Sequence, residues 1–550
     1  MPEYLAPGVY VEELDIGAKS IEGVSTSTAG FIGETERGAC TPQLVTAVEQ
    51  FARLFGRGGF DVRGNISQSY LPAAVKGFFD NGGSRCFVCR VVGKNAKSAS
   101  RDFGGGGSGV SESSSPADPE ESKKGGKASN PSPQSGKSGT TAVKVTAVGP
   151  GAWGNRVSLE IDPSDLFEAG HQIRGKIFNC KVCYWTDNPP REGIPTPDDP
   201  KPSLVEYYDN LSIDPKSPDY FKKRVNGRSA LVWIDQESDI SPASFDGRLF
   251  LKGGVDGSDL DEGDYNGDPL TEPGKRTGLL AFEEIDEISI LCAPNENDKP
   301  ELKLTEALRT HCEKMKDRFA ILQCSQTADP LEKLRPPVDS KYAAFYYPWI
   351  YTINPDDGNK QLIPPGGHIA GVYARSDNER GVHKAPANEV IRGVVGLQFP
   401  VKTGEQVILN PRGVNCIRAF EGRGIRVWGA RTTSSDPSWK YLNVRRLFLY
   451  LEESIEEGTQ WVVFEPNDQR LWARVKQTVT DFLIRVWRDG ALLGATPDEA
   501  FFVRCDRSTM TQDDLDNGRL VALIGIAPVK PAEFVIFRLF QHRGGSDVLE

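Results

Sequence analysis

Three stretches of the sequence have residue types and spacing that could support chemistry. The first, Ser-Gly-Lys-Ser at 135–138, ends like a phosphate-binding P-loop. The first glycine of that motif would fall at Pro131, and the motif also requires a strand before it and a helix after it. Here the flanking sequence is of low complexity, so we do not predict a nucleotide site.

The ten cysteines include two Cys-x-x-Cys pairs, which in other settings bind zinc. The pairs are Cys86 with Cys89 and Cys180 with Cys183, and they lie about 90 residues apart in the chain. Both are in runs typical of strands, not in glycine-rich knuckles. We therefore expect buried or half-exposed thiols in a reducing cytoplasm, without metal and without disulfides.

The acidic run Asp256–Pro269 suggests calcium, but it does not fit an EF-hand. In the register that starts at Asp264, the required glycine is Pro269 and the closing glutamate is Lys275. The five histidines show no metal-ligand spacing, and there is no Gly-x-Ser-x-Gly elbow. We expect no catalytic, cofactor or metal site, although a hydrolase triad assembled in space remains an alternative.

Composition narrows the class of protein further. A chain of 550 residues is too long for one ordinary core, so several domains are expected. The net charge of −11 argues against a general nucleic-acid-binding protein. No apolar run approaches the length of about 20 residues that a membrane helix needs, and the N-terminus does not resemble a secretion signal. We expect a soluble protein, made in the cytoplasm, without membrane insertion.

The hydrophobic pattern predicts a mixed α/β core in two parts that flank an insertion. Residues 23–103 contain strands at 28–33 and 85–92 and helices at 41–56 and 69–83. Residues 104–139 have Val110 and two alanines as their only apolar side chains, which predicts a flexible linker. Residues 140–277 carry four strand patterns with long loops, which predicts a β-rich outer insertion domain.

The α/β pattern returns in residues 278–412, where strand and helix alternate as in a mostly parallel sheet. We expect a strand at 287–294, a helix at 304–317, and further strands at 319–324 and 342–353. The fold class is therefore α/β, or α+β overall, with several domains.

Residues 413–528 are predicted to form a C-terminal domain, with two strands around a turn in 415–431 and a helix at 441–458. A second helix spans 467–489, with Asn467 as its expected N-cap and Gly490 as its stop. Its apolar residues recur every three to four positions, and basic residues lie beside that stripe: Arg470, Arg474, Lys476, Arg485 and Arg488.

Both ends of the chain carry strand-forming residues with no partner nearby in the sequence. Val9, Tyr10 and Val11 follow Pro7-Gly8 in segment 1–22. Segment 529–550 contains a second such stretch: Glu533, Phe534, Val535, Ile536 and Phe537. An isolated strand exposes unpaired N–H and C=O groups and is a template for another chain. We expect both segments to be arms that pair with neighbouring subunits, although both could instead fold back on their own subunit.

The C-terminal half resembles the sheath proteins of contractile phage tails and related injection systems. The stretches that carry the resemblance are 381–397, 413–447, 463–472, 494–506 and 526–541, with Leu5–Leu14 near the start and 251–269 in the insertion. The resemblance implies stacked six-subunit rings around an inner tube, knitted together by exchanged terminal strands. It also implies a baseplate and a cap as partners, and contraction that drives the tube through a target envelope.

The resemblance gives specific residues expected roles. Gly8, Pro528 and Pro531 flank the arm strands and are candidate hinges, with ordinary turns as the alternative. The five basic residues of the 467–489 helix are candidate contacts to an acidic tube, and a solvated helix face is the alternative. The second hypothesis for the function of the protein is a static shell or adhesin subunit, and the third is an α/β hydrolase. Phage tail and bacterial injection device are not distinguished.

Overall fold

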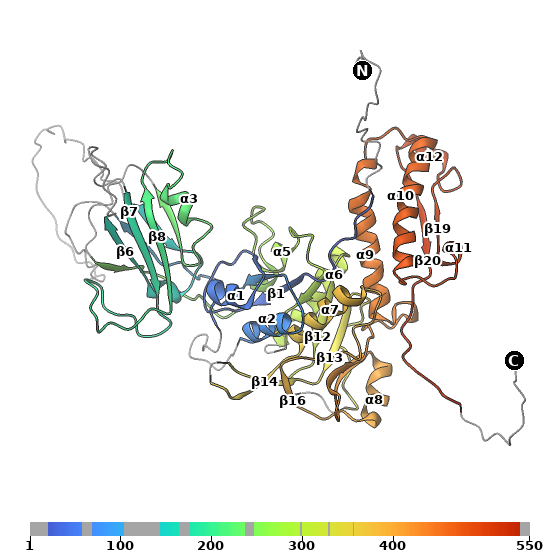
Figure 1. The fold of residues 1–550 in the computed structure, drawn as a ribbon, viewed down its shortest axis with the longest axis horizontal. Coiled ribbons are helices and arrows are strands. Elements are labelled where there is room, and N and C mark those ends of the chain that lie inside the picture. The colour runs from blue at the N-terminus through green and yellow to red at the C-terminus, as the bar shows by residue number, and fades with distance from the viewer. Residues whose placement is uncertain are drawn as a thin grey trace, which may run out of the picture.

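The computed structural model describes residues 20–57, 69–103, 143–163, 177–236, 247–297, 300–327, 331–355 and 357–538. Figure 1 shows three parts side by side: a β-rich part at one end, an α/β core in the middle and a helical part at the other end. The predicted α/β fold class with several sheets is confirmed. No helix in the described ranges is long and apolar enough to cross a membrane.

The core is built on an eight-stranded sheet whose central strands are parallel. Its order is β18-β17-β13-β12-β11-β1-β3-β2, and only the outermost pairs, β17–β18 and β2–β3, are antiparallel. Strands covered on both faces are mostly apolar, and β1, β12 and β13 are buried at every position. The strands are β1 (Ala29–Gly33), β2 (Gln43–Val45), β3 (Cys86–Arg90), β11 (Ile290–Cys292), β12 (Phe319–Gln323), β13 (Ala343–Tyr347), β17 (Val414–Phe420) and β18 (Gly424–Trp428).

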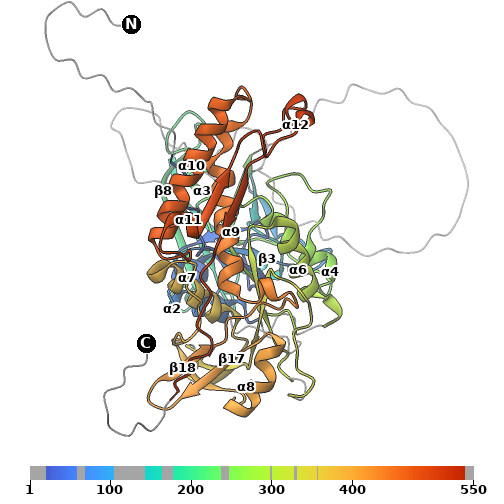
Figure 2. The same cartoon turned by 90° about the vertical axis from the view of Figure 1, so that its right-hand side faces the viewer.

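Helices cover both faces of this sheet (Figure 2). On one face, α2 (Leu71–Asp80) crosses α7 (Gly366–Arg380) at very short range. A Cβ added at Gly367 would lie 2.3 Å from the Ala74 carbonyl oxygen, so glycine is what permits this approach. The helices beside these are α1 (Val48–Phe55) and, on the opposite face, α4 (Glu262–Asn266), α5 (Gly278–Phe282) and α6 (Leu304–Met315).

Two predicted elements of the core are divided in the structure. The segment 41–56, expected as one helix, forms β2 at the sheet edge and then α1, because Gln50 accepts a hydrogen bond from the Thr46 backbone N–H and closes a turn between them. The expected strand 342–353 is broken at Pro348, which has no N–H to donate. Its second half joins a separate sheet made of β14 (Ile350–Ile353), β15 (Lys360–Ile363) and β16 (Val394–Leu397).

The β-rich part contains two antiparallel sheets around buried Trp153, Val182 and Leu211. The four-stranded sheet has the order β10-β6-β7-β8, and the three-stranded sheet has the order β4-β5-β9. The predicted linker 104–139, with its Ser-Gly-Lys-Ser stretch, lies outside the described residues. The elements are β4 (Ser100–Phe103), β5 (Val143–Ala147), η1 (Ala152–Arg156), β6 (Val157–Pro163), β7 (Ile177–Tyr184), β8 (Leu204–Ser212), α3 (Phe221–Val225), β9 (Val232–Gln236) and β10 (Arg248–Phe250).

The helical part consists of two long helices and a small sheet, with its own apolar core. Leu471, Val475, Val479, Phe482 and Val486, which recur every three to four residues, are all buried, so the amphipathic pattern is confirmed. The elements are α9 (Leu442–Gly458), α10 (Gln469–Arg488), α11 (Pro497–Ala500), β19 (Phe501–Arg504), α12 (Gln512–Asp516) and β20 (Leu523–Ile526). The remaining short helices are η2 (Pro300–Leu302), α8 (Thr403–Leu409), η3 (Asn410–Arg412), η4 (Pro437–Trp439) and η5 (Gln460–Val462).

The predicted two strands in 415–431 form the β17–β18 hairpin, and this hairpin completes the core sheet. Residues 413–428 therefore pack with the core, whereas the sequence pattern groups them with the C-terminal domain. The division of the chain into domains remains a proposal, and the hairpin favours a boundary after Trp428.

Candidate functional site

Helix α9 is fastened to the core by a buried ion pair. Arg446 on α9 donates to both carboxylate oxygens of Asp377 on α7, at 3.0 and 2.5 Å. The two side chains are 3% and 2% exposed, and the Thr26 hydroxyl donates a further hydrogen bond to Asp377. One carboxylate thus ties together the N-terminal segment, the core and the C-terminal helices. The sequence did not single out either residue.

The described chain begins in a groove between α9 and α10. Ile21 is buried there, and a Cβ added at Gly458 would lie 2.6 Å from it, so the end of α9 fits closely around this side chain. Arg485 donates to the Ile21 carbonyl oxygen at 2.6 Å, and the Val24 N–H donates to Ser454 at 3.1 Å. We call residues 20–26 the N-terminal root, because the predicted arm strand Val9–Val11 precedes them; the predicted arm segment 1–22 therefore ends in residues that contact their own subunit.

Near the other end of the chain, Glu533 is held close to the start of α9. The carboxylate of Glu533 accepts hydrogen bonds from Asn410 at 2.8 Å, from Arg431 at 2.8 Å through two nitrogens, and from the Tyr441 hydroxyl at 3.1 Å. Lys440 lies 3.4 Å away as an additional cation. We call these four residues the Glu533 receptor.

The receptor holds Glu533 in its charged form. Partial burial alone would raise the pKa of Glu533, but hydrogen bonds from Arg431 and Asn410 and the positive charges of Arg431 and Lys440 lower it to about 2. Because the pKa of Glu533 is depressed, its contact contributes its full stability at pH values above the ordinary glutamate pKa. That contribution is lost only as the pH falls toward 2. The contact is therefore intact at every physiological pH.

The residues before Glu533 are also tied to their own chain. The Val529 N–H donates to the Ala491 carbonyl oxygen at 3.1 Å, and Asn443 on α9 donates to the Val529 carbonyl oxygen at 3.3 Å. Pro528 forms a β-bridge with Leu492. We call residues 527–533 the C-terminal root.

The side chains that directly follow the C-terminal root are apolar and exposed. Phe534, Val535, Ile536 and Phe537 are between 69% and 84% exposed and form no strand within the described residues. Adjacent residues of an extended segment point to opposite faces, so this run is apolar on both faces and needs cover on both. The pairing of this arm stays a prediction. Val9, Tyr10, Val11 and the candidate hinge Gly8 lie outside the described residues.

The small sheet beside these roots has only two strands. β19 pairs with β20 from Phe501–Ile526 to Arg504–Leu523, and no other named strand in the described ranges pairs with either. An isolated two-stranded sheet is marginally stable, and its edges present unpaired backbone groups. Three apolar side chains of this region are about half exposed: Leu493, Phe502 and Leu523.

The structure separates the five basic residues predicted on α10. All five are exposed. Four of them fall within an arc of about 60° on the helix, on one flank of the buried stripe: Arg470, Arg474, Arg485 and Arg488. Lys476 lies on the other flank. Arg474 also stacks on Trp461 at 4.4 Å, and Arg485 is engaged with Ile21.

The predicted N-cap of this helix is wrong by one residue. Asp468 caps α10 by accepting hydrogen bonds from the N–H groups of Arg470 and Leu471, both at 2.9 Å. Asn467 instead accepts from the Trp472 indole at 2.7 Å, since a side chain one position earlier reaches over the first turn. Gly490 follows the helix end with a φ of 81°, as its role as a stop requires.

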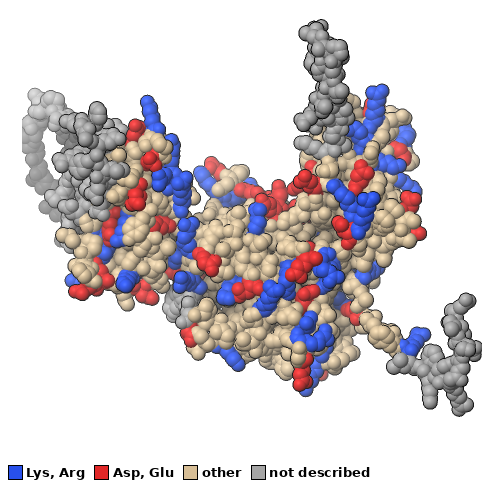
Figure 3. Space-filling view, in the orientation of Figure 1, with Lys and Arg blue, Asp and Glu red and all other residues tan. Residues whose placement is uncertain are grey.

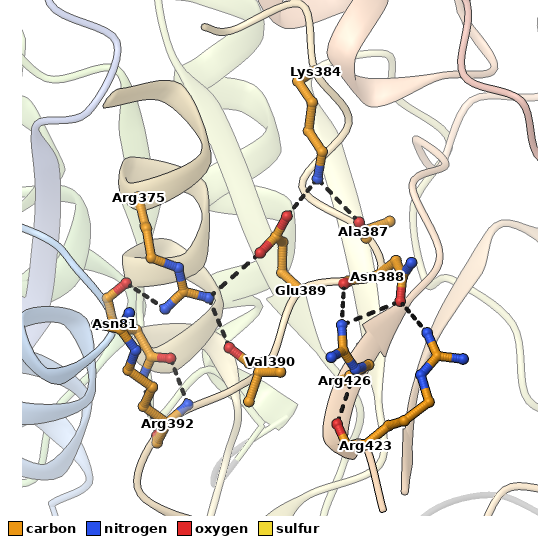
Figure 4. Close-up of polar contacts among 10 residues, drawn as sticks. All are labelled: Asn81, Arg375, Lys384, Ala387, Asn388, Glu389, Val390, Arg392, Arg423 and Arg426. Carbon is orange, nitrogen blue, oxygen red and sulfur yellow. Dashed lines mark hydrogen bonds and ion pairs between the residues drawn. The ribbon is translucent and has the colours of Figure 1, made fainter. Parts of the chain in front are cut away.

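The 381–397 stretch, one of those that carried the resemblance, is a loop that leads into β16 and contacts several core elements (Figure 4). Arg375 on α7 donates to the backbone carbonyls of Asn81 at 2.9 Å and Val390 at 2.7 Å. Arg426 on β18 donates to the Asn388 carbonyl at 2.7 Å, and Lys384 pairs with Glu389 at 2.5 Å. These contacts fix the loop against α2, α7 and the core sheet, so its basic residues serve packing.

Two aromatic side chains occupy part of the position at which a hydrolase of this fold class would bind substrate, and a cavity of about 1320 Å³ opens beside it, lined among others by Glu34, Ser69 and Val91. In open α/β sheets, ligands bind at the carboxyl ends of the strands where the strand order reverses, here between β1 and β11. Tyr70 and Trp349 lie against each other over these strand ends with ring centroids 5.2 Å apart, and both are buried. The Tyr70 N–H donates to Asn295, which follows β11, and the Trp349 indole donates to the Cys324 carbonyl after β12.

The Cys-x-x-Cys pairs are buried free thiols. Burial raises the pKa of Cys89 to about 12 and that of Cys183 to about 11, which keeps both protonated. Over the described ranges, no group of three or more His, Cys, Asp or Glu side chains is arranged to hold a metal ion. The acidic run 256–269 contains α4, which Asp261 and Asp264 cap reciprocally.

Glu453 on α9 makes the stability of this helix pH-dependent. Burial and the nearby carboxylates of Asp317 and Glu457 raise the pKa of Glu453 to about 8. The folded chain then binds one more proton than the unfolded chain between about pH 4.5 and 8, so stability falls as the pH rises through that range. We expect Glu453→Gln to stabilise the protein by about 1 kcal/mol at pH 8, because water screens this partly exposed group, and to have no effect at pH 4.

Thermal melts of both proteins at the two pH values measure this difference. Glu456→Gln, an exposed change on the same helix, is the control and should leave the melting temperature unchanged at both. Equal gains for Glu453→Gln at pH 4 and pH 8 would contradict the assignment.

Comparison with known proteins gives the family of the chain. Residues 269–433 match the model of the phage tail sheath protein central domain, and residues 434–541 match that of the phage tail sheath C-terminal domain. The tail sheath protein of Vibrio phage KVP40 is 26% identical over 217 residues, which are 39% of this chain and 31% of the relative. A putative major tail sheath protein of a Pseudomonas aeruginosa prophage is 29% identical over 182 residues, 32% of this chain and 45% of the relative.

Solved structures extend the likeness of fold to nearly the whole chain. The helical sheath of the anti-feeding prophage in its contracted state matches with a TM-score of 0.55 and 23% identity, over 98% of this chain and all of that one. The sheath tail protein from Listeria innocua matches with a TM-score of 0.55 and 11% identity, over 93% and 96% of the two chains. The aligned regions span less than half of the two curated relatives above. Both domain models describe phage tail sheath proteins, so the comparisons support the resemblance that the sequence predicted.

Proposed function

We propose that this protein is the structural subunit of a contractile sheath, which polymerises as stacked six-subunit rings around an inner tube. The observation that carries the proposal is the apolar run Phe534–Phe537, which leaves the subunit exposed on both faces next to a two-stranded sheet with open edges. Within the described residues, neither the segment nor the edges of the sheet pair with another strand, so the two are complementary between copies.

The arms pair with the β19–β20 sheet of neighbouring subunits by strand addition. Main-chain hydrogen bonds at the open sheet edges provide affinity, and exposed Phe502 and Leu523 offer apolar contacts for the arm's side chains. The N-terminal arm, with Val9–Val11, takes one neighbour, and the C-terminal arm, with Phe534–Phe537, takes another. Contacts of this head-to-tail kind do not close on themselves, so they propagate into a lattice.

Contraction is a switch between two packings of the same subunits. The extended lattice is formed during assembly, and small gains at each interface sum over many subunits when the contracted lattice forms. The arms stay paired while the rigid core and the C-terminal helices reorient. Gly8 is the candidate hinge of the N-terminal arm. Pro528 and Pro531, the candidates that the sequence suggested for the C-terminal arm, precede its exposed run Phe534–Phe537. The baseplate and a cap close the two ends of the particle, and synthesis takes place in the cytoplasm.

The tube contact is the arginine face of α10, meaning Arg470, Arg474, Arg485 and Arg488. Exposed cations on a rigid helix suit a surface that must bind an acidic tube and later release it, because such pairs are individually weak. On the face shown in Figure 3, blue and red side chains are interspersed over the molecule, including the part that contains α10. A local basic arc therefore matters more for the tube contact than the net charge.

We expect charge reversal at Arg470 and Arg488 to weaken binding of the sheath to purified tube. Both side chains lie on the arginine face and outside the buried stripe, so the fold should survive. Co-sedimentation at low and high salt measures the effect, which should be largest at low salt because the Debye length is then longest. Lys476→Glu, on the other flank of the same helix, is the matched control. Equal loss for the control would leave the arginine face without a special role.

Electron microscopy of the purified protein and its particles tests the proposal as a whole. The expected images are long hollow tubes in two states, one long and narrow and one short and wide. Rigid shells in a single state would favour the static shell or adhesin subunit, and discrete particles would favour the hydrolase.

A further inference from the structure

The Glu533 receptor is more elaborate than an exposed chain end needs. One carboxylate accepts from three side chains, and a fourth, Lys440, adds its charge. Arg431 is itself held in place, since its backbone N–H donates to Asn415 and its side chain donates to the Asn410 carbonyl, at 2.8 and 2.9 Å. The Glu533 side chain is 18% exposed, whereas the four residues that follow are mostly exposed.

We propose that the receptor of Asn410, Arg431, Lys440 and Tyr441 is a docking site for the root of the C-terminal arm, and that the moving joint of this arm begins at Phe534. This inference rests on the proposed function and refines it. Glu533 stays seated in its own subunit, while the chain from Phe534 onward reaches a second copy. Pro528 and Pro531, which the sequence suggested as hinges, then lie inside the fixed root.

The two roots lie at opposite ends of one rigid element. The N-terminal root contacts Ser454 and Gly458 at the end of α9, and the C-terminal root contacts Tyr441 and Asn443 at its start. A helix of 17 residues is about 25 Å long, so α9 sets the distance between the points from which the two arms depart. Fixing both roots keeps that spacing constant while the subunit moves.

A fixed root also shortens the tether of the arm. If Glu533 were released, the chain would be held next at Val529, and four more residues would move freely. A longer flexible tether lowers the effective concentration of the arm at its acceptor sheet. Glu533 is therefore a positioning residue for assembly. It fixes the base of the arm both in the unassembled subunit and in the lattice.

Amide exchange in the unassembled full-length chain tests where the joint lies. The wild-type chain should be protected up to Glu533 and exchange fast from Phe534, and Glu533→Gln should move this boundary back toward Val529. Glu421→Gln, at an exposed position on the β17–β18 turn, is the matched control. Fast exchange from Pro528 onward in the wild type would overturn the proposal, whether or not the protein forms sheaths.

Assembly provides the second measurement. Glu533→Gln should raise the concentration needed for sheath formation roughly tenfold at an unchanged melting temperature, because the tether is longer and the arm itself is intact. A chain ending at Glu533 should not assemble at all. Loss of assembly by the truncated chain with no change for Glu533→Gln would overturn the fixed joint and retain the arm. Normal assembly by the truncated chain would refute the arm, and with it the proposed function.

Discussion

Deletion of residues 1–14 is expected to leave a folded subunit that cannot form long sheaths. The segment lies before the N-terminal root, so Ile21 and its contacts with α9 and α10 remain. Each backbone hydrogen bond contributes about 1 kcal/mol net, and the loss of about four bonds per contact weakens it about 1,000-fold. Sedimentation velocity and electron microscopy of the variant check the result.

The matched control is deletion of residues 104–139, which removes a longer stretch far in sequence from both arms. That segment is almost without apolar side chains, and loop length has only a slow logarithmic cost. The control should keep both its melting temperature and its ability to assemble. Normal sheaths from the chain that lacks residues 1–14 would refute the N-terminal arm.

Asp377→Ala is expected to destabilise the protein by about 3–5 kcal/mol, because it leaves the Arg446 guanidinium buried without its counter-charge. The same change removes the acceptor of the Thr26 hydroxyl, so the N-terminal root loosens as well. Urea unfolding followed by tryptophan fluorescence measures the loss. We expect the C-terminal helices to separate from the core first.

Asp80→Ala is the matched control for this experiment. Asp80 pairs with Lys76 on the surface of α2, where both side chains are more than a third exposed. Surface pairs typically contribute between zero and about 1 kcal/mol, so the control should unfold close to the wild type. A loss for Asp377→Ala no larger than that of the control would show that the buried pair does not fasten α9.

The sequence predicted the long elements well because their signals are local. The stripe from Leu471 to Val486 repeats with helical period, and the apolar run Phe319–Gln323 has the form of a strand buried on both faces. Both elements are present as expected. The N-cap at Asp468 was missed because Asn467, its neighbour, is an equally good capping residue type. The break at Pro348 was missed because the apolar residues on both sides of it suggest one strand, although proline has no N–H to donate.

The candidate site was only partly accessible from sequence. The sequence drew attention to the segment around Glu533 as an arm but gave no reason to place the carboxylate on Arg431, about 100 residues earlier in the chain. The basic residues of α10 were all identified, yet their separation into an arginine face, a lone Lys476 and the Ile21 contact of Arg485 required the helix in place.

By itself, the sequence determined the resemblance to tail sheath proteins, the α/β class and the periodic elements, because these depend on residue order within short windows. The tertiary structure decided which charges meet. Asp377 with Arg446 and Glu533 with Arg431 are joined across the fold, and only packing brings such partners within hydrogen-bond distance. Electrostatic contacts act through space and leave no period in the sequence, so the roots of both arms became visible only when the chain was folded.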